Sequence, residues 1–312
     1  MEEERGDKDR LKKVFVLLVG IFLIGTLLAY WFFPFNDVGF NFNGNSNFSL
    51  NVSKQEMQFY PNMRFPLKEI SYEISDECSL QKKGDMVWAF EIIEDETILD
   101  FYSVENDGLI KVYCEDRNRI KEGLFIAGEG GPVNVSIGKY YNVIHGGEIL
   151  LIKASTCERP NIAIHELLHV LGFDHSDNPN NIMYPISKCK QTIGDDTIDL
   201  INDLYSISNY PDLEFENASA NLKGRMINID FSVRNEGLRD SEGFSVVLYL
   251  NNKEIKRFDS DGLKIGYGER VRLSNYVISQ LKVDEVRFVI ESDFNELRKD
   301  NNEIVLELVE KS

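Results

Sequence analysis

The chain has 312 residues, a net charge of −18 at pH 7 and a hydrophobic share of 43%. This length suits two modest domains and an additional segment better than one small domain. The first thirteen residues carry equal numbers of acids and bases, so the acidic excess lies downstream. An acidic surface repels the phosphate backbone, and we therefore exclude nucleic-acid binding.

Residues 14–33 read VFVLLVGIFLIGTLLAYWFF and carry no charge. As a helix this run would be about 30 Å long, which matches the hydrocarbon core of a membrane. A cleaved signal peptide is the alternative, but the run is long and no small-residue cleavage site follows it. Basic residues precede the run and the next one is Lys54, so we predict a single-pass signal anchor in the cell membrane. Residues 1–13 would be cytoplasmic and the rest extracellular.

Residues 34–60 are rich in Asn, Phe, Ser and Gly without a sustained period, and we interpret them as a linker. Their Phe residues could instead dock on the domain that follows. Residues 61–208 alternate strand and helix patterns and predict a domain with a mixed sheet. The expected strands are 70–74, 99–104, 109–115, 124–128 and 148–152, and the expected helices are 79–96, 161–172 and 195–207. In the first helix we expect Met86, Val87, Phe90 and Ile93 on one side.

From residue 212 the pattern changes to alternation of apolar and polar residues, with turn signals at Asn251-Asn252 and Asp261-Gly262. This pattern predicts a β-sandwich over residues 212–312. The expected fold class is therefore α+β: an N-terminal transmembrane helix, a catalytic domain with a mixed sheet, and a C-terminal β-sandwich.

Four cysteines, Cys78, Cys114, Cys157 and Cys189, fit an oxidising extracellular location. They allow three pairings, among which sequence alone cannot choose. We favour Cys78–Cys114 with Cys157–Cys189, because the second bridge would bracket the histidine cluster described next. The alternative is four separate buried thiols.

Three of the four histidines lie in HELLHVLGFDH, residues 165–175. On a helix His165 and His169 project from one face, and two imidazoles at that spacing can bind one Zn²⁺. Gly172 lets the chain turn so that His175 becomes the third ligand. Three protein ligands leave one position for a water molecule, and Glu166 lies beside the metal as its general base. The extended motif predicts a zinc hydrolase.

The stretch HELLHVLGFDHSDNPNNIMYP resembles the metzincin metalloproteases, and among them the matrixins. The resemblance implies that Met183 forms the Met-turn beneath the zinc. Pro185 occupies the place of a metal-site tyrosine found in other metzincins, so Tyr184 has no ligand role. The chain departs from the family pattern in two ways: it shows no pro-domain with a cysteine switch and no second histidine cluster for a structural zinc. His145 alone is not assigned to the metal site.

The segments VRNEG (233–237), GFSVVLYLNNKEI (243–255) and DFNELRKDNNEIVLEL (293–308) resemble a CARDB module, an immunoglobulin-like sandwich. The resemblance implies a surface partner for this domain, although a rigid spacer explains it equally well. Four acidic residues could bind Ca²⁺, but a solvated acidic edge is the simpler interpretation; they are Asp293, Glu296, Asp300 and Glu303.

Together these patterns predict a membrane-anchored extracellular zinc endopeptidase. Its catalytic residue is Glu166 and its zinc ligands are His165, His169 and His175. The substrate is a protein or peptide, which would lie extended along an exposed edge strand. We expect this edge at Glu148–Ile152. The alternative is a non-catalytic adhesion or scaffold protein that acts through its sandwich, but the intact Glu166 favours the enzyme.

Overall fold

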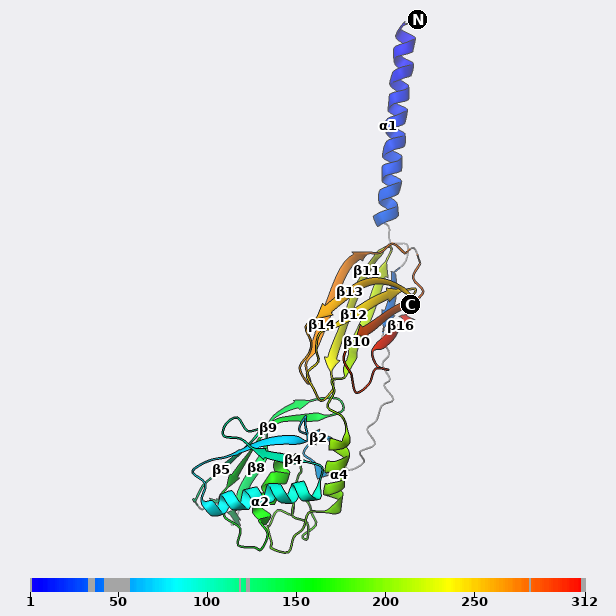
Figure 1. Ribbon diagram of the computed structural model, residues 1–312. Helices are drawn as coiled ribbons and strands as arrows, with labels where there is room; N and C mark the ends of the chain where they lie inside the picture. The colour runs from blue at the N-terminus through cyan, green and yellow to red at the C-terminus, as the bar shows by residue number, and fades with distance from the viewer. Residues whose placement is uncertain are drawn as a thin grey trace.

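The computed structural model describes residues 2–32, 37–41, 57–117, 119–121, 124–280 and 282–309. It contains an N-terminal helix, an α/β domain and a β-sandwich, in the arrangement drawn in Figure 1. The α/β domain holds the elements from β2 to α4, and the sandwich holds those from β10 to β16. The predicted fold class is thus confirmed for both domains.

The N-terminal helix, α1 (Glu2–Phe32), covers the predicted anchor except for its last residue. From Val14 to Leu28 every residue of this helix is exposed except Gly20, which is half-buried. Within the described part of the chain, no helix is long and apolar enough to span a membrane. The predicted transmembrane anchor is therefore not supported.

The α/β domain is built on a mixed sheet, as the sequence predicts. Four neighbouring pairs run parallel in the order β2-β9-β5-β3-β4, and β8 pairs antiparallel with β9. A small hairpin, β6–β7, lies apart from this sheet. The strands are β2 (Met63–Arg64), β3 (Glu69–Ile74), β4 (Asp100–Ser103), β5 (Ile110–Cys114), β6 (Arg119–Lys121), β7 (Leu124–Ile126), β8 (Gly128–Ile137) and β9 (Asn142–Leu151).

Three helices cover this sheet: α2 (Leu80–Glu96), α3 (Asn161–Val170) and α4 (Asp195–Ser206). Ser79 caps α2 by accepting a hydrogen bond from the N–H of Lys82. The inner face of α2 carries Met86, Phe90 and Ile93, as predicted, but Val87 is exposed. Phe90 and Ile93, four and seven residues after Met86, lie on the same face of the helix as Met86, whereas Val87 points about 100° away from it.

Two disulfides brace the α/β domain, and both predicted pairs are confirmed. Cys78–Cys114 joins the segment before α2 to the end of β5. Cys157–Cys189 joins the segment before α3 to the loop before α4. The second bridge encloses the whole histidine motif within its loop.

The C-terminal domain is a sandwich in which all strand pairs are antiparallel. The strand order is β13-β12-β15-β16-β1-β10-β11-β14. Asn251 and Asn252 both adopt positive φ and form the predicted tight turn between β12 and β13. The strands are β10 (Leu213–Lys223), β11 (Met226–Asn235), β12 (Phe244–Leu250), β13 (Lys253–Ser260), β14 (Gly268–Val277), β15 (Val286–Glu291) and β16 (Glu303–Val309).

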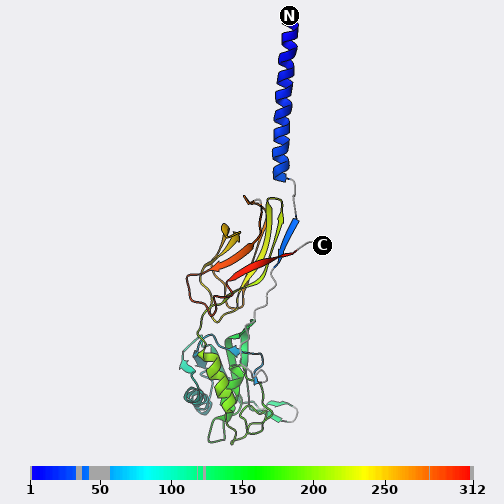
Figure 2. The ribbon, with the colours of Figure 1, turned by 90° about the vertical axis from the view of Figure 1, so that its right-hand side faces the viewer.

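One strand of the sandwich comes from the far end of the chain. β1 (Asp37–Asn41) pairs with both β10 and β16, with Asp37 opposite Lys223 and Gly39 opposite Val309. Figure 2 shows this blue strand beside the red β16. The linker predicted over 34–60 is therefore wrong for residues 37–41, which belong to the sandwich, and at Gln58, which bridges to Phe173 of the α/β domain. Residues 34–36 and 42–56 lie outside the described residues. The α/β domain is inserted between two neighbouring strands of the sandwich.

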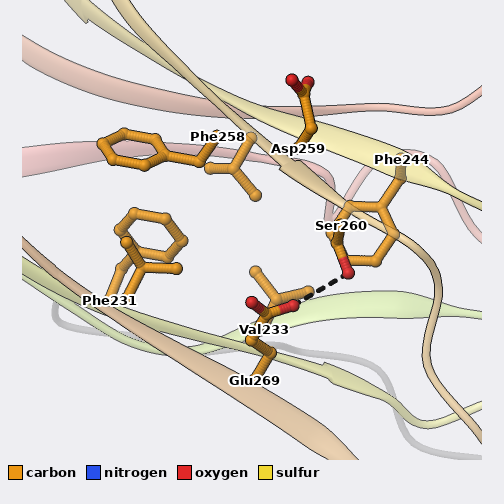
Figure 3. Close-up of a pocket in the computed structure, with 9 residues that line it drawn as sticks. Phe231, Val233, Phe244, Phe258, Asp259, Ser260 and Glu269 are labelled. Atoms are coloured by element: carbon orange, nitrogen blue, oxygen red, sulfur yellow. Dashed lines mark hydrogen bonds between the residues drawn. The ribbon is translucent and has the colours of Figure 1, made fainter.

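The sandwich core opens between its two terminal strands, β13 and β14. Apolar side chains of Phe231, Val233, Phe244 and Phe258 line this opening. At its mouth the Ser260 hydroxyl donates a hydrogen bond to Glu269, as Figure 3 shows. The opening belongs to the sandwich core alone and includes none of the histidine motif.

Candidate metal centre and active site

Helix α3 places His165 and His169 on one face, one turn apart, as the spacing predicts. Both imidazoles are buried. Their Nε2 atoms lie 3.0 Å from each other, and that of His169 lies 3.2 Å from Nε2 of His175. Two ligands held at about 2.0–2.1 Å in a tetrahedron lie about 3.3 Å apart, so these spacings fit one zinc ion.

His175 reaches the pair because the chain reverses at Gly172. This glycine has a φ of +96°, and a Cβ there would lie 2.7 Å from Cγ of Met63. Only glycine combines this backbone conformation with the close contact to Met63. The Gly172 N–H donates to the carbonyl of His169, which ends the helix. Within the described residues, these three histidines form the one group of side chains arranged to hold a metal ion.

Backbone carbonyls fix the two buried imidazoles. Nδ1 of His165 lies 2.6 Å from the carbonyl oxygen of Ile182, and Nδ1 of His169 lies 2.8 Å from that of Phe173. A carbonyl only accepts hydrogen bonds, so each Nδ1 must carry the proton and each Nε2 has a free lone pair. Burial lowers the pKa of His165 to about 4 and also lowers the pKa of His169. Both imidazoles are therefore neutral near pH 7, as metal ligands must be.

Glu166 follows His165 in α3, and its side chain is almost fully buried against β8. Its carboxylate accepts a hydrogen bond from the backbone N–H of Gly130, and a Cβ on Gly128 would lie 2.7 Å from its Cγ. Burial raises the pKa of Glu166 to about 8, with a smaller contribution from the charge of Glu129. Such a carboxylate has a high affinity for a proton, which a general base requires.

Comparison with family models agrees with this geometry. Residues 64–206 match the matrixin model of peptidase family M10, and residues 210–305 match the CARDB model. The chain is a matrixin metalloendopeptidase domain followed by a CARDB domain. No curated protein matches the chain.

Two solved structures show partial similarity. The CARDB domain of a Pyrococcus furiosus protein in complex with di-metal ions is 17% identical, with a TM-score of 0.27; the match covers 31% of this chain and 89% of that one. High choriolytic enzyme 1, a hatching enzyme zinc-protease from the medaka fish Oryzias latipes, is 22% identical, with a TM-score of 0.24. That match covers 41% of this chain and 54% of the hatching enzyme, so the chain spans about half of its length.

Met183 of the matrixin domain is buried, in the segment that follows the third histidine. Its carbonyl accepts a hydrogen bond from the N–H of Ser176, next to His175, and the preceding residue, Ile182, holds His165. Tyr184 instead faces Lys188, whose Nζ lies 5.8 Å from its ring centre. The segment around Met183 thus lies against two of the metal ligands, and its role as the Met-turn stays a prediction.

The edge strand of the matrixin sheet differs from the predicted one. Residues Glu148–Leu151 of β9 pair with β5 on one side and β8 on the other, so they are central. Among the described strands, β8 pairs with β9 alone and leaves its other edge free. The prediction failed because a sequence such as EILLI looks the same in an edge strand and in a central strand. The glycine-rich sequence GEGGP of β8 was the available signal, because glycines in a strand allow another backbone, here that of α3, to come close.

Two further predictions concern residues outside the triad. His145 on β9 hydrogen-bonds Ser136 at 2.9 Å and lies apart from the metal group, as expected. The possible Ca²⁺ site is not supported: among the described residues its four acids form no group that could hold a metal ion. Glu296 instead accepts hydrogen bonds from Leu213 and Asn302, and Glu303 pairs with Arg287. These carboxylates stabilise the sandwich.

Proposed function

We propose that the matrixin domain cleaves internal peptide bonds of proteins, with Glu166 as the general base. The proposal rests mainly on the convergence of three Nε2 atoms, two of them from the helix that also carries the buried carboxylate of Glu166. Zinc held by His165, His169 and His175 would acidify a water molecule and polarise the scissile carbonyl. The proton transfers would be carried out by a side chain of the protein.

Glu166 would accept a proton from the attacking water and later deliver it to the leaving amine. Its position against Gly128 and Gly130 limits its rotation, so the carboxylate stays between α3 and β8. A substrate would add to the free edge of β8, because that edge begins beside Glu166 and offers unpaired backbone groups. Met183 would support the histidines from below as the Met-turn.

The test is Glu166→Gln in the whole chain, with zinc content and hydrolysis of a peptide library measured in parallel. We expect one zinc ion per chain in both proteins and a loss of at least about a thousandfold in kcat/KM. Asp174→Asn, which changes an exposed acid next to His175, is the matched control and should remain active. Substantial turnover by Glu166→Gln, or by a chelated wild-type protein, would contradict the proposal.

Location follows from the cysteines. Both disulfides join residues far apart in sequence, and such bonds persist in oxidising compartments. We propose that the two domains act outside the cell. Membrane attachment stays a prediction, supported by the exposed apolar side chains from Val14 to Leu28. Fractionation of cells that express the whole chain or residues 34–312 tests it; equal release of both into the medium would refute attachment.

A further inference from the structure

The free edge strand β8 joins the catalytic centre to the sandwich. At its start, a Cβ on Gly130 would lie 2.3 Å from the carbonyl oxygen of Glu166, so the strand touches the active-site helix. At its end, Arg234 of the sandwich donates a hydrogen bond from Nη2 to the carbonyl oxygen of Ile137, at 3.0 Å. One strand therefore contacts both the catalytic helix and the CARDB domain.

The carbonyl that Arg234 binds faces the free edge of β8. The N–H of Gly138 bonds the carbonyl of Tyr141 across the hairpin, so the next pair, Ile137 and Asn142, is a non-hydrogen-bonded pair. In such a pair the backbone groups point away from the partner strand. Arg234 thus occupies the position that the next added strand would use, and it closes the free edge at this end.

The sandwich surrounds this end of β8 closely. The Lys139 N–H donates a hydrogen bond to Glu236 at 2.6 Å, and a Cβ on Gly266 would lie 3.1 Å from Cβ of Ser136. Behind the hairpin, the Arg298 guanidinium stacks 4.0 Å from the ring centre of Tyr140. Buried side chains from both domains fill the interface between them, which we call the joint: Tyr140, Tyr141, Val143, Leu238 and Ile265.

The joint is also charged and largely shielded from water. Arg298 binds Asp212 and Glu214, and all three side chains are at most 13% exposed. The Tyr140 hydroxyl donates a hydrogen bond to Glu214 at 2.8 Å. Because this network ties the hairpin to the start of β10 and to the loop between β15 and β16, the two domains hold a defined orientation at β8.

The length of β8 sets the size of what would bind. Gly130 and Ile137 are seven residues apart, which is at most about 23 Å at about 3.3 Å per residue, because the pairing with β9 is irregular around Asn134. A chain that adds antiparallel to β8 runs with its N-terminal part towards the sandwich. Along this path the side chains of Val133 and Ile137 are 59% and 53% exposed, and Tyr267, next to Gly266, is 63% exposed.

We propose that the CARDB domain forms the end wall of the substrate cleft and binds the substrate about seven residues before the scissile bond. The occupant is an extended, flexible segment of a protein, bound antiparallel to β8 and met at its N-terminal side by Arg234 and Tyr267. This inference rests on the proposed peptidase function. It makes the sandwich a determinant of substrate length and sequence.

The first test compares two quenched fluorescent peptides that share one cleavage core. One has about four residues before the scissile bond and the other about eight, so only the second reaches the sandwich. For the whole chain we expect the longer peptide to have a kcat/KM about tenfold higher. Tyr267→Ala and Arg234→Ala should reduce this ratio to about two or less and leave the short peptide unchanged.

Arg257→Ala is the matched control, because this half-exposed arginine lies on β13 and pairs with Glu291. It should keep the tenfold ratio. Equal rates for both peptides in the wild-type chain, or equal losses on both peptides in the variants, would overturn the inference. A gain from extension after the scissile bond with none from extension before it would overturn it too.

A second test does not depend on turnover. Peptides carrying a photoreactive phenylalanine about four or eight residues before the scissile bond are bound to Glu166→Gln and irradiated. The more distant probe should label residues 264–268 of the sandwich, and the nearer one should label β8. Labelling elsewhere would refute the inference even if the chain cleaved no peptide, whereas correct labelling without wild-type cleavage would refute only the peptidase proposal.

Discussion

The two disulfides offer a controlled test of how the metal site is held, because their loops are almost equal in length. They join residues 32 and 36 positions apart. The loss of chain entropy on closing such loops predicts about 3.7 and about 3.8 kcal/mol of stabilisation at 25 °C. Replacing either pair of cysteines by serine should therefore lower the free energy of unfolding of the zinc-free protein by nearly the same amount.

Zinc affinity should separate the two variants. The Cys157–Cys189 loop contains all three histidines and Met183, and near its ends Asn161 Nδ2 donates to the carbonyl of Lys188 at 2.8 Å. Opening this loop loosens His175 and the Ile182 carbonyl that orients His165. We expect a loss of about tenfold or more in zinc affinity, comparable to the removal of a residue that orients a ligand.

The Cys78–Cys114 loop encloses none of these residues and should change zinc affinity by less than about twofold. The assays are denaturant unfolding of the chelated proteins and competition for zinc with a fluorescent chelator. Equal zinc affinity in the two variants would refute the idea that the disulfide holds the metal-site loop. A large difference in unfolding free energy would refute the entropy estimate.

Three further predictions concern single residues. Gly172→Ala should destabilise the protein by about 2–4 kcal/mol in urea unfolding, because φ is +96° and the new Cβ meets Met63; a change below about 0.5 kcal/mol would contradict this. Arg64→Met should cost about 3–5 kcal/mol, since the buried guanidinium donates to the carbonyls of Leu204, in the last turn of α4, and of Ile207, just after it; intact stability would contradict its role. Burial raises the pKa of Tyr205 to about 12 from 10, so the unfolded chain loses this proton first and stability falls as pH rises through this window. Between pH 9 and pH 11 the wild-type protein should lose about 1.3 kcal/mol more than Tyr205→Phe, and equal losses would show that Tyr205 is not the group responsible.

The active-site helix and its ligands could be predicted because every requirement is local. The spacing of His165 and His169 specifies one helical face, and Gly172 specifies the turn that returns His175. The disulfide pairing was favoured on the same ground, since Cys157 and Cys189 flank that motif. Local sequence patterns are therefore sufficient to predict most of the metal site.

Features that depend on distant pairing could not be predicted. β1 has five residues and no clear alternation, and its partner Lys223 lies far along the chain, so its strand role emerges only once the sandwich exists. The assignment of β8 as the edge depends on which side of β9 is taken by β5. The contact of Arg234 with Ile137 depends on how two domains meet, and neither sequence pattern contains that information.

The central claim is that three imidazoles hold one catalytic zinc ion beside Glu166. Diffraction at the zinc absorption edge, from crystals of the whole chain grown with zinc, tests it most directly. We predict a single anomalous peak about 2.0–2.1 Å from the Nε2 atoms of His165, His169 and His175. A peak at other residues, or none between these three imidazoles, would contradict the account.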